Sequence, residues 1–399
     1  MSNLNLLVIT TGFPRFNGDL FGTFIYEQVT ALCDRKVIVQ VVAPHEAGLS
    51  RVEKMGEINI RRFRYLWPEK WQCVAYGGGI PTNIRTSWCT RIQLPVFILG
   101  FVWGVFKQRY GIQVVHCHWT VSGLIASWVF GKQVPIVLSV RGSDIKLFNN
   151  FFSRFFNRHI ISRMECVVAV SDDLANSLKK IGVQKERIKV IPNGVSARFQ
   201  PGDRALSRRE QNLPEEGFII LFVGLFVHVK GLDVLVDALS NWQKDIDWKC
   251  VLVGEGPEKN NIVDQIQNYG LERQFVFAGS QAADRIPVWM QAADLLVLPS
   301  RSEGRPNVCI EAQACGIPVV ATRVGGTAEV VIDGKTGVLV DPEDSDALEA
   351  ALTSMKYDEN LRLKMGQTAR THVKEQGLTW EENASKLHEL YKKLLVRKA

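Results

Sequence analysis

The stretch Ser300-Arg301-Ser302-Glu303-Gly304-Arg305-Pro306-Asn307-Val308-Cys309-Ile310-Glu311-Ala312 joins an apolar run to a helical pattern. The run before it, Leu295-Leu296-Val297-Leu298, is typical of a buried strand in a parallel sheet. Pro306 suits the first turn of a helix, and Gly316 suits the left-handed position at which a helix ends. The stretch therefore predicts a strand, a turn and a helix in succession.

Two carboxylates lie on either side of the predicted helix start. Glu303 falls in the turn at the carboxyl end of the strand, and Glu311 falls on the helix. The first N–H groups of a helix have no partner within it and bind phosphate readily. Carboxylates beside such a site favour a ligand with hydroxyls and phosphates, such as a nucleotide sugar. The alternative is two solvated surface glutamates, and this short motif alone does not decide between them.

The composition is that of a globular protein with more than one domain. The 399 residues suggest two to three domains, with 46% hydrophobic and 22% charged residues. No basic segment precedes the first apolar run, so we expect no signal peptide. The longest apolar run, 94–106, is shorter than the roughly 18 residues that span a bilayer. Eight scattered cysteines without CxxC spacing favour reduced thiols in a cytoplasm and yield no zinc or iron–sulfur ligand set.

Positive charge is concentrated in the first half. Residues 1–200 carry 25 Lys+Arg against 12 Asp+Glu, whereas the remainder is net negative. Basic residues alternate with aromatic ones at 61–67 and 146–158. This mixture suits an anionic membrane surface, and it would also suit single-stranded nucleic acid, whose bases stack on aromatic rings. The alternative is a set of amphipathic helices whose basic side chains extend to water.

Strands and helices alternate through the first half. A strand at 6–10 leads into a loop with Gly18, Gly22 and Thr23, and a helix and a second strand follow. This order predicts a doubly wound sheet, but the loop lacks the G-x-G-x-x-G spacing of a dinucleotide site. Residues 66–92 hold three tryptophans and three consecutive glycines, and we predict a long functional loop there.

The alternation starts again after a turn-rich segment at 196–216. Polar residues recur where predicted strands end, which is where open α/β sheets bind ligands. We therefore predict two doubly wound domains, 1–198 and 199–379, with a ligand in a cleft between their strand ends.

Five motifs between residues 190 and 326 resemble those of one enzyme family. They are Val190-Ile191-Pro192-Asn193-Gly194-Val195, Lys230-Gly231, Gly254-Glu255-Gly256-Pro257, the spacing Glu303-x7-Glu311 within Glu-Gly-x-Pro-Asn, and Gly325-Gly326. Their order and spacing resemble the retaining glycosyltransferases of family 4, over nearly the whole chain. The resemblance implies the GT-B fold, in which two Rossmann-like domains face each other across a cleft. It also implies a C-terminal helix, about 380–399, that crosses back to the N-terminal domain.

The resemblance implies a role for each matching residue. Glu311 would accept hydrogen bonds from the ribose, Glu303 would hold the transferred sugar, and Lys230 would neutralise the leaving diphosphate. The backbone from Gly304 to Val308 would bind sugar hydroxyls and a phosphate. The loop after the first strand would close on the diphosphate, and Gly279 and Ser280 would contact the base. The implied donor-binding set is Glu311, Gly304, Arg305, Pro306, Asn307, Val308, Gly279, Ser280, Gly18, Gly22 and Thr23.

The chain departs from the family pattern at two positions. In family members, an arginine follows the glycine at the end of the first strand of the C-terminal domain. In this chain that glycine is Gly224, and the next residue is Leu225. Lys230 would then act alone or with another cation such as Arg301 or Arg305. The family's histidine before Gly-Ser-Asp is Arg141 here, which would bind a phosphate or change the sugar contact. His118, and less so His116, is a further candidate for a catalytic role at a strand end, against a structural role.

The resemblance implies transfer of a sugar from a nucleotide-diphosphate sugar to an acceptor hydroxyl with retention of configuration. We expect no cofactor and no metal, because Lys230 and a helix N-terminus serve the diphosphate, and we interpret Asp245-Ile246-Asp247 as a loop. A UDP-sugar is favoured over a GDP- or ADP-sugar. The alternatives are a nucleotide-sugar epimerase on the same scaffold and a non-catalytic nucleotide- or nucleic-acid-binding module.

The expected acceptor is a saccharide or a lipid-linked saccharide bound by the basic N-terminal domain. Its charge predicts peripheral binding to an anionic membrane surface that is lost at high salt. We expect a cytoplasmic enzyme, at the inner face of the cytoplasmic membrane, in the assembly of a cell-surface polysaccharide such as lipopolysaccharide. Nucleic acid is not an expected partner.

Overall fold

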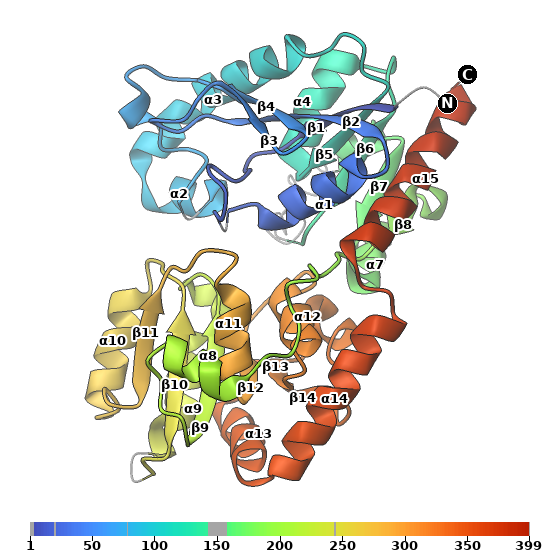
Figure 1. The fold of residues 1–399 in the computed structure, drawn as a ribbon. Helices are drawn as coiled ribbons and strands as arrows, with labels where there is room; N and C mark the ends of the chain where they lie inside the picture. The colour runs from blue at the N-terminus through green and yellow to red at the C-terminus, as the bar shows by residue number, and fades with distance from the viewer. Residues whose placement is uncertain (1–3, 20, 78, 143–157, 243–244, 399) are drawn as a thin grey trace. The chain divides into compact units, whose positions relative to one another are not determined.

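The computed structural model describes residues 4–19, 21–77, 79–142, 158–242 and 245–398 (Figure 1). The chain forms two compact units: 1–194 with 380–399, and 195–379. It leaves the second unit at Thr379 and re-enters the first at Trp380. The first crossing lies four residues before the predicted boundary, and the cleft between the units stays a prediction.

The first unit is built on an eight-stranded sheet in the order β3-β4-β2-β1-β5-β6-β7-β8. β3 is antiparallel to β4, and the other neighbouring pairs are parallel. Parallel neighbours need crossover connections, which helices supply here. The strands are β1 Leu4–Ile9, β2 Val37–Pro44, β3 Val52–Met55, β4 Ile58–Phe63, β5 Val114–His118, β6 Ile136–Val140, β7 Cys166–Ala169 and β8 Ile188–Val190.

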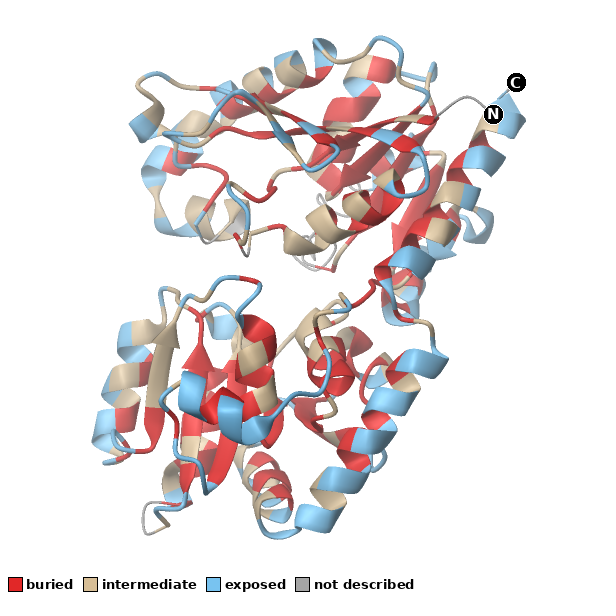
Figure 2. Ribbon diagram, viewed as in Figure 1, coloured by how far each residue is buried: buried red, intermediate tan, exposed pale blue. Residues whose placement is uncertain are grey.

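Helices cover both faces of this sheet. On β1, Leu6 and Val8 pack into one core with α1 and α15, while Leu7 and Ile9 pack into another with α3 and α4. Successive strand residues point to opposite faces, so a strand covered on both sides is apolar throughout, as Figure 2 shows for the central strands. The described helices are α1 Thr23–Cys33, α2 Ile80–Thr86, α3 Trp88–Phe106, α4 Thr120–Phe130, α7 Asp172–Lys180 and α15 Trp380–Lys398.

The second unit is built on a six-stranded parallel sheet in the order β11-β10-β9-β12-β13-β14, with one large apolar core. The strands are β9 Phe218–Val223, β10 Trp248–Val253, β11 Phe275–Gly279, β12 Leu295–Leu298, β13 Val319–Thr322 and β14 Gly337–Val340. The described helices are α8 Arg204–Glu210, α9 Leu232–Leu239, α10 Lys259–Asn268, α11 Ile286–Ala292, α12 Asn307–Ala314, α13 Ser345–Tyr357 and α14 Glu359–Glu375. The prediction of two doubly wound α/β sheets is confirmed.

Residues 66–92 are not the long loop that we predicted. They contain the 3-10 helix Glu69–Trp71, helix α2 and the start of α3. The glycines and tryptophans misled the prediction because several lie at helix ends, as Gly79 does before α2. α3 also continues through Pro95, so the apolar run 94–106 belongs to a 19-residue helix. Among the described helices, α3 alone has the length and apolar character that a membrane span requires.

The basic and aromatic stretch 146–158, one of the two that suit a membrane surface, lies outside the described residues, apart from its last position. The other stretch, 61–67, follows the second half of β4 out of the sheet.

Helix α15 returns to the first unit and packs beside α1. Its Tyr391 is fully buried, and the hydroxyl hydrogen-bonds His116 Nδ1 on β5 at 2.6 Å. His116 Nε2 in turn hydrogen-bonds Ser139 Oγ on β6 at 2.7 Å. Asn383 on the same helix donates to the Pro192 carbonyl at 2.7 Å. These buried polar contacts fix α15 against the sheet, and they make His116 a structural residue.

Replacing Tyr391 tests this attachment. Tyr391→Phe leaves a buried imidazole nitrogen without its partner, so we expect the free energy of unfolding to fall by about 1–3 kcal/mol in urea denaturation. Tyr357→Phe is the control. The Tyr357 hydroxyl also hydrogen-bonds a side chain, that of Asp245, but Tyr357 itself is 72% exposed. Loss of this hydroxyl should lower the free energy of unfolding by less than about 0.5 kcal/mol. Equal costs for the two variants would contradict the assigned role of Tyr391.

Candidate functional site

Both sheets reverse their strand order once. The reversal lies between β1 and β5 in the first unit and between β9 and β12 in the second. Open α/β sheets bind ligands at this point, outside the carboxyl ends of the strands. The predicted site residues lie largely in the loops that leave these strands.

The loops after β9 and β12 meet through a charged pair. Lys230 Nζ lies 2.7 Å from Glu303 Oε1, and Ser300 Oγ donates to the same oxygen at 2.6 Å. The side chain of Glu303 is only 11% exposed and that of Lys230 is 24% exposed. Attraction between charges with little hydration is strong, so each side chain holds the other in place. The structure thus brings together two predicted catalytic residues that are distant in sequence.

A glycine allows the two loops to approach this closely. Gly231 has a φ of 66°, and a Cβ there would lie 2.1 Å from the carbonyl oxygen of Pro299. No side chain fits at that distance, and the positive φ also favours glycine. The backbone N–H of Arg301 then donates to the Val229 carbonyl at 2.8 Å, which joins the two loops beside Lys230.

Arg301 is engaged by carboxylates. Its guanidinium lies within 2.7 Å of Asp233, pairs with Glu343 and donates to the His228 carbonyl at 2.6 Å. The hydrogen bond with Asp233 raises the pKa of Arg301 above its usual value. Two carboxylates already neutralise this cation, so it is a poor replacement for the arginine absent at Leu225.

The first turn of α12 lies directly after the Glu303 turn. The helix begins at Asn307 with Pro306 before it, one residue later than the sequence suggested. Gly304 accepts a hydrogen bond from the Gly326 N–H at 3.1 Å, which ties the turn to the Gly325-Gly326 motif. The first N–H groups of a helix have no partner within the helix, and Val308 supplies one of them here.

The side chains of Arg305 and Glu311, on either side of the start of α12, differ in how far they are buried. Arg305 is only 6% exposed, with Nη1 3.8 Å from Glu329 Oε2. That burial makes its backbone, more than its guanidinium, the group presented to solvent. Glu311 is half-buried on α12.

The ends of β9, β10 and β11 are held together by glycines. Gly254 has a φ of 145°, and a Cβ there would lie 1.9 Å from the Gly224 carbonyl oxygen. Its N–H donates to the Gly279 carbonyl at 2.9 Å. Gly279 therefore lies at the same edge as the Lys230 loop, and Ser280 follows it as an exposed residue.

In the first unit, the loop after β1 is closed by an ion pair. Arg15 and Asp19 contact each other at 2.7 and 3.1 Å, and the Thr23 hydroxyl donates to the Asp19 carbonyl at 3.0 Å. Gly22 adopts a φ of 76° immediately before α1, and Gly18 has a φ of 91°. Gly18, Gly22 and Thr23 thus shape the turn ahead of α1 at the reversal point.

Arg141 and His118 lie together at the ends of β6 and β5. Arg141 Nη2 donates to His118 Nδ1 at 3.3 Å, and Nη1 donates to the Asn193 side-chain oxygen. The guanidinium also lies 4.4 Å from the centre of the Phe24 ring. A guanidinium has no acceptor, so His118 Nδ1 must accept and the imidazole proton sits on Nε2.

Burial lowers the pKa of His118 well below its usual value, with contributions from His116 and Arg141. The ring is therefore neutral at pH 7, and its Nε2–H is a donor without a hydrogen-bond partner among the described residues. The whole side chain is buried.

Two polar residues of these arrangements were absent from the predicted site. Ser300 orients Glu303, and Asn193 holds Arg141. Both follow predicted strands in the quoted motifs, so the position after a strand was the available signal. Their partners lie on other loops, which a single sequence does not reveal.

Within the Asp245-Ile246-Asp247 segment, the carboxylate of Asp245 is engaged by neighbouring side chains. Asp245 pairs with Lys356 and accepts from the Tyr357 hydroxyl at 2.9 Å. Over the described ranges of the chain, no three His, Cys, Asp or Glu side chains group together in a way that would hold a metal ion.

Two family models together match most of the chain. The family model "Glycosyl transferases group 1" matches residues 203–372, and "Glycosyltransferase Family 4" matches residues 21–199. A D-inositol 3-phosphate glycosyltransferase of Salinispora arenicola is 32% identical over 76% of this chain and 74% of its own length. The chain belongs to glycosyltransferase family 4. The predicted membership of family 4 is thereby confirmed.

Solved structures of glycosyltransferases share the fold. Sucrose-phosphate synthase from Thermosynechococcus elongatus matches with a TM-score of 0.84 and 24% identity, over 99% of this chain and all of that one. HepE of Anabaena, solved in complex with UDP-glucose, matches with a TM-score of 0.77 and 19% identity, over 98% of this chain and all of that one. At these identities they establish the fold, which is GT-B.

The buried histidines predict an acid-sensitive fold. Burial lowers the pKa of His116 to about 3 and that of His118 well below normal, whereas both take up a proton near pH 6.5 when unfolded. The unfolded state then binds more protons, so the free energy of unfolding falls as pH falls from about 6.5 toward 3. We expect a loss of about 2 kcal/mol per histidine between pH 7 and pH 5, measured by urea denaturation.

Replacing one histidine separates this cause from others. His118→Asn should reduce the difference between pH 7 and pH 5 by about 2 kcal/mol. His228→Asn, at an exposed position in the second unit, should leave it as in the wild type. An unchanged pH difference in His118→Asn would show that this imidazole is not held neutral.

Proposed function

We propose that this glycosyltransferase moves a sugar from a UDP-sugar to a hydroxyl of a saccharide or lipid-linked acceptor, with retention at the anomeric carbon. The observation that carries the proposal is the Lys230–Glu303 pair at 2.7 Å beside the first turn of α12. A cation, an anion and a row of backbone N–H donors meet there. These groups match a diphosphate joined to a polyhydroxylated sugar.

Binding of the donor would rearrange this pair. The diphosphate carries the greater negative charge and draws Lys230 toward itself, and the helix N–H groups bind a second phosphate oxygen. Glu303, still oriented by Ser300, accepts hydrogen bonds from hydroxyls of the sugar. Glu311 accepts bonds from the ribose hydroxyls, and Gly279 and Ser280 contact the base.

The reaction proceeds on one face of the sugar. The bond from the anomeric carbon to the phosphate oxygen breaks while the acceptor oxygen attacks from the same side. The acceptor proton passes to the leaving phosphate oxygen. Catalysis then comes from positioning and from Lys230, which stabilises charge that grows on the diphosphate. The proposal needs neither cofactor nor metal, because Lys230 and the α12 N-terminus supply the positive charge.

The first unit would contribute two further groups. Arg141 supplies a cation at the position of the family's usual histidine, and His118 presents a neutral Nε2–H donor beside it. The turn formed by Gly18, Gly22 and Thr23 would close on the diphosphate. In these roles Arg141 and His118 contact the reacting groups, and Asn193 positions the Arg141 guanidinium.

The proposed donor and acceptor are chosen from a protein that shares the fold and from the charge of residues 1–200. UDP is favoured because HepE, which shares the fold, was solved with UDP-glucose. The excess of 25 Lys+Arg over 12 Asp+Glu in residues 1–200 supports an anionic acceptor at a membrane surface, and nucleic acid is not a proposed partner. The setting that we propose is cytoplasmic assembly of a cell-surface polysaccharide, such as lipopolysaccharide, with the enzyme peripheral on the inner face of the cytoplasmic membrane.

Removing either charge of the pair tests the function. We expect Lys230→Ala and Glu303→Gln each to lower the transfer rate by about 10²–10³-fold, because each removes an interaction that the transition state needs. The measurement is transfer from the nucleotide sugar that gives the largest thermal stabilisation, on a panel of saccharide and lipid-linked acceptors. Circular dichroism confirms that the variants are folded.

The controls are Lys335→Ala and Glu216→Gln, which change exposed charges in the same unit and should keep wild-type rates. Near-wild-type transfer by Lys230→Ala or Glu303→Gln would refute the proposed site. A product of inverted configuration would refute the mechanism. Conversion of the donor without an acceptor would identify an epimerase instead, and salt-sensitive RNA binding without donor stabilisation would identify a binding module.

A further inference from the structure

Helix α3 is apolar on its outer face. Trp88, Ile92, Val96, Leu99, Trp103 and Phe106 recur at intervals of three and four residues, and all are exposed. Leu99 is 68% exposed and Trp103 is 58% exposed. On a helix this spacing forms one continuous stripe.

The inner face of α3 already packs in the core. Phe97, Phe101 and Val105 are fully buried. Gly100 and Gly104 let the helix approach the end of β4 and the residues after it, since a Cβ on Gly104 would lie 2.7 Å from Phe63 Cβ. A helix at the surface of a globular protein is normally polar on its outer face. The outer stripe of α3 is therefore not explained by packing within its unit.

Aromatic and basic side chains border this stripe. Trp67 and Trp71 are both more than half exposed, and Trp71 is tied to α3 by the Gln93 side chain, which donates to its carbonyl at 2.9 Å. The Arg64 guanidinium lies 5.1 Å from the Trp67 ring centre, and Lys107 Nζ lies 5.0 Å from that of Trp103. Tryptophan beside basic residues is the composition found where proteins meet the membrane interface.

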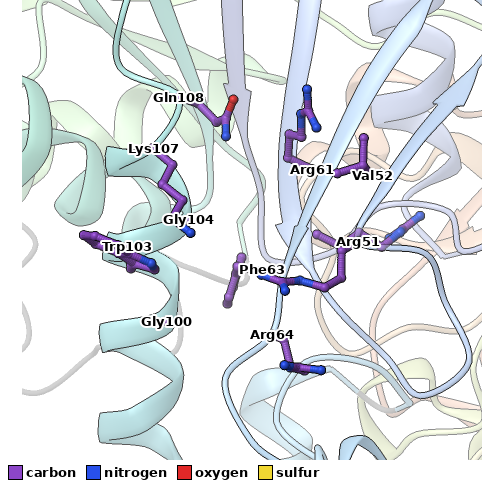
Figure 3. A pocket seen from close by; sticks show the side chains of 11 residues that line it. Arg51, Val52, Arg61, Phe63, Arg64, Gly100, Trp103, Gly104, Lys107 and Gln108 are labelled. Carbon is purple, nitrogen blue, oxygen red and sulfur yellow. The ribbon is translucent and has the colours of Figure 1, made fainter.

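A basic pocket opens beside the stripe (Figure 3). Its volume is about 300 Å³. Helix α3 forms one wall, and strands β3 and β4 form the other. Five cations and no carboxylate lie among its lining residues. The lining is Arg51, Val52, Arg61, Arg62, Phe63, Arg64, Gly100, Trp103, Gly104, Lys107 and Gln108.

Two of the five cations are neutralised by neighbours. Arg62 pairs with Glu53 at 2.6 Å, and Arg64 pairs with Glu69 at 3.1 Å. Arg51, Arg61 and Lys107 have no ion pair with a carboxylate in the part of the chain that the structure describes, and Arg61 Nε is buried there without a hydrogen-bond partner. The pocket therefore has positive charge in excess of what its surroundings neutralise.

We propose that the α3 stripe and this pocket form a docking surface for an anionic phospholipid bilayer. The stripe, from Trp88 to Phe106, lies among the acyl chains at the interface. The pocket binds a lipid phosphate through Arg51, Arg61 and Lys107. Charge complementarity and the tryptophans select this occupant. The inference specifies the membrane partner within the proposed function, but it does not depend on the transfer reaction.

Other occupants fit less well. A second copy paired through the same face would bring two cationic pockets together, which opposes association. Single-stranded nucleic acid would stack on aromatic rings, but Ile92, Val96 and Leu99 occupy the middle of the stripe and suit acyl chains instead.

Vesicle flotation tests the surface with the full chain. We expect binding to phosphatidylcholine vesicles that contain phosphatidylglycerol, and much weaker binding to phosphatidylcholine alone. Leu99→Glu should weaken binding by at least about tenfold, because a charge replaces buried apolar area in the interface. Its control is Ile246→Glu, which alters a residue 74% exposed in the second unit and should bind as the wild type.

The pocket is tested by a double variant. Arg51→Gln with Lys107→Gln should weaken binding to the anionic vesicles roughly 30-fold, at about 1 kcal/mol per cation near the surface. The control Lys335→Gln with Lys364→Gln removes two exposed charges from the second unit and should have a smaller effect. The sequence alone predicted binding that high salt abolishes. With the apolar stripe in contact with the bilayer, high salt should instead weaken binding of the wild type without abolishing it.

The outcomes separate this inference from the transferase proposal. Wild-type binding by Leu99→Glu, or no flotation of the wild type, would refute the docking surface. A lipid-free dimer that Leu99→Glu converts to a monomer would make the stripe a subunit interface. Transfer to a soluble saccharide by Leu99→Glu should equal that of the wild type. Wild-type protein that floats with anionic vesicles but transfers no sugar would count against the proposed function and leave the docking surface standing.

Discussion

The reversal of strand order is the constraint from which the candidate site follows. Crossovers in parallel sheets are right-handed, so a change of direction between β9 and β12 sends the adjoining connections to opposite faces. Only at that point do loops from two strands meet without a helix between them. Lys230 and Glu303 occupy those two loops. The position of the pair is thus a consequence of topology, while its chemistry is a property of the side chains.

The strand that carries Glu303 is fixed at both ends. At its amino end, Asp294 pairs with Arg208 at 2.7 Å, both side chains 3% exposed, and accepts the Ile219 N–H at 2.7 Å. At its carboxyl end, Ser300 orients the Glu303 carboxylate. Buried charges are costly unless every one is satisfied, and removing one partner typically costs several kcal/mol. The strand whose carboxyl end leads to Glu303 is therefore supported by an ion pair at its opposite end.

The fold was largely predictable because buried parallel strands are continuous apolar runs that end at glycine or polar residues. The same rule and the family resemblance pointed to Glu303 and Lys230 as candidates, and the structure places their side chains 2.7 Å apart, while their catalytic roles stay a prediction. The engagement of Arg301 by Asp233 and Glu343 was not, because it joins residues distant in sequence. The sequence also did not predict the full length of α3. Proline and glycine usually interrupt a helix, but Pro95 and the two glycines of α3 lie within it.

The return of helix α15 to the first unit has a consequence for synthesis on the ribosome. Residues 195–379 form a contiguous unit and are able to fold as soon as they emerge. The first unit lacks Leu387, Tyr391 and their neighbours in its core until residues 380–399 have been translated. Until then, the surface of α1 and β5 that α15 covers is exposed to solvent. Completion of the N-terminal unit thus waits for residues 380–399, and a chain that stops before them leaves that unit with an open core.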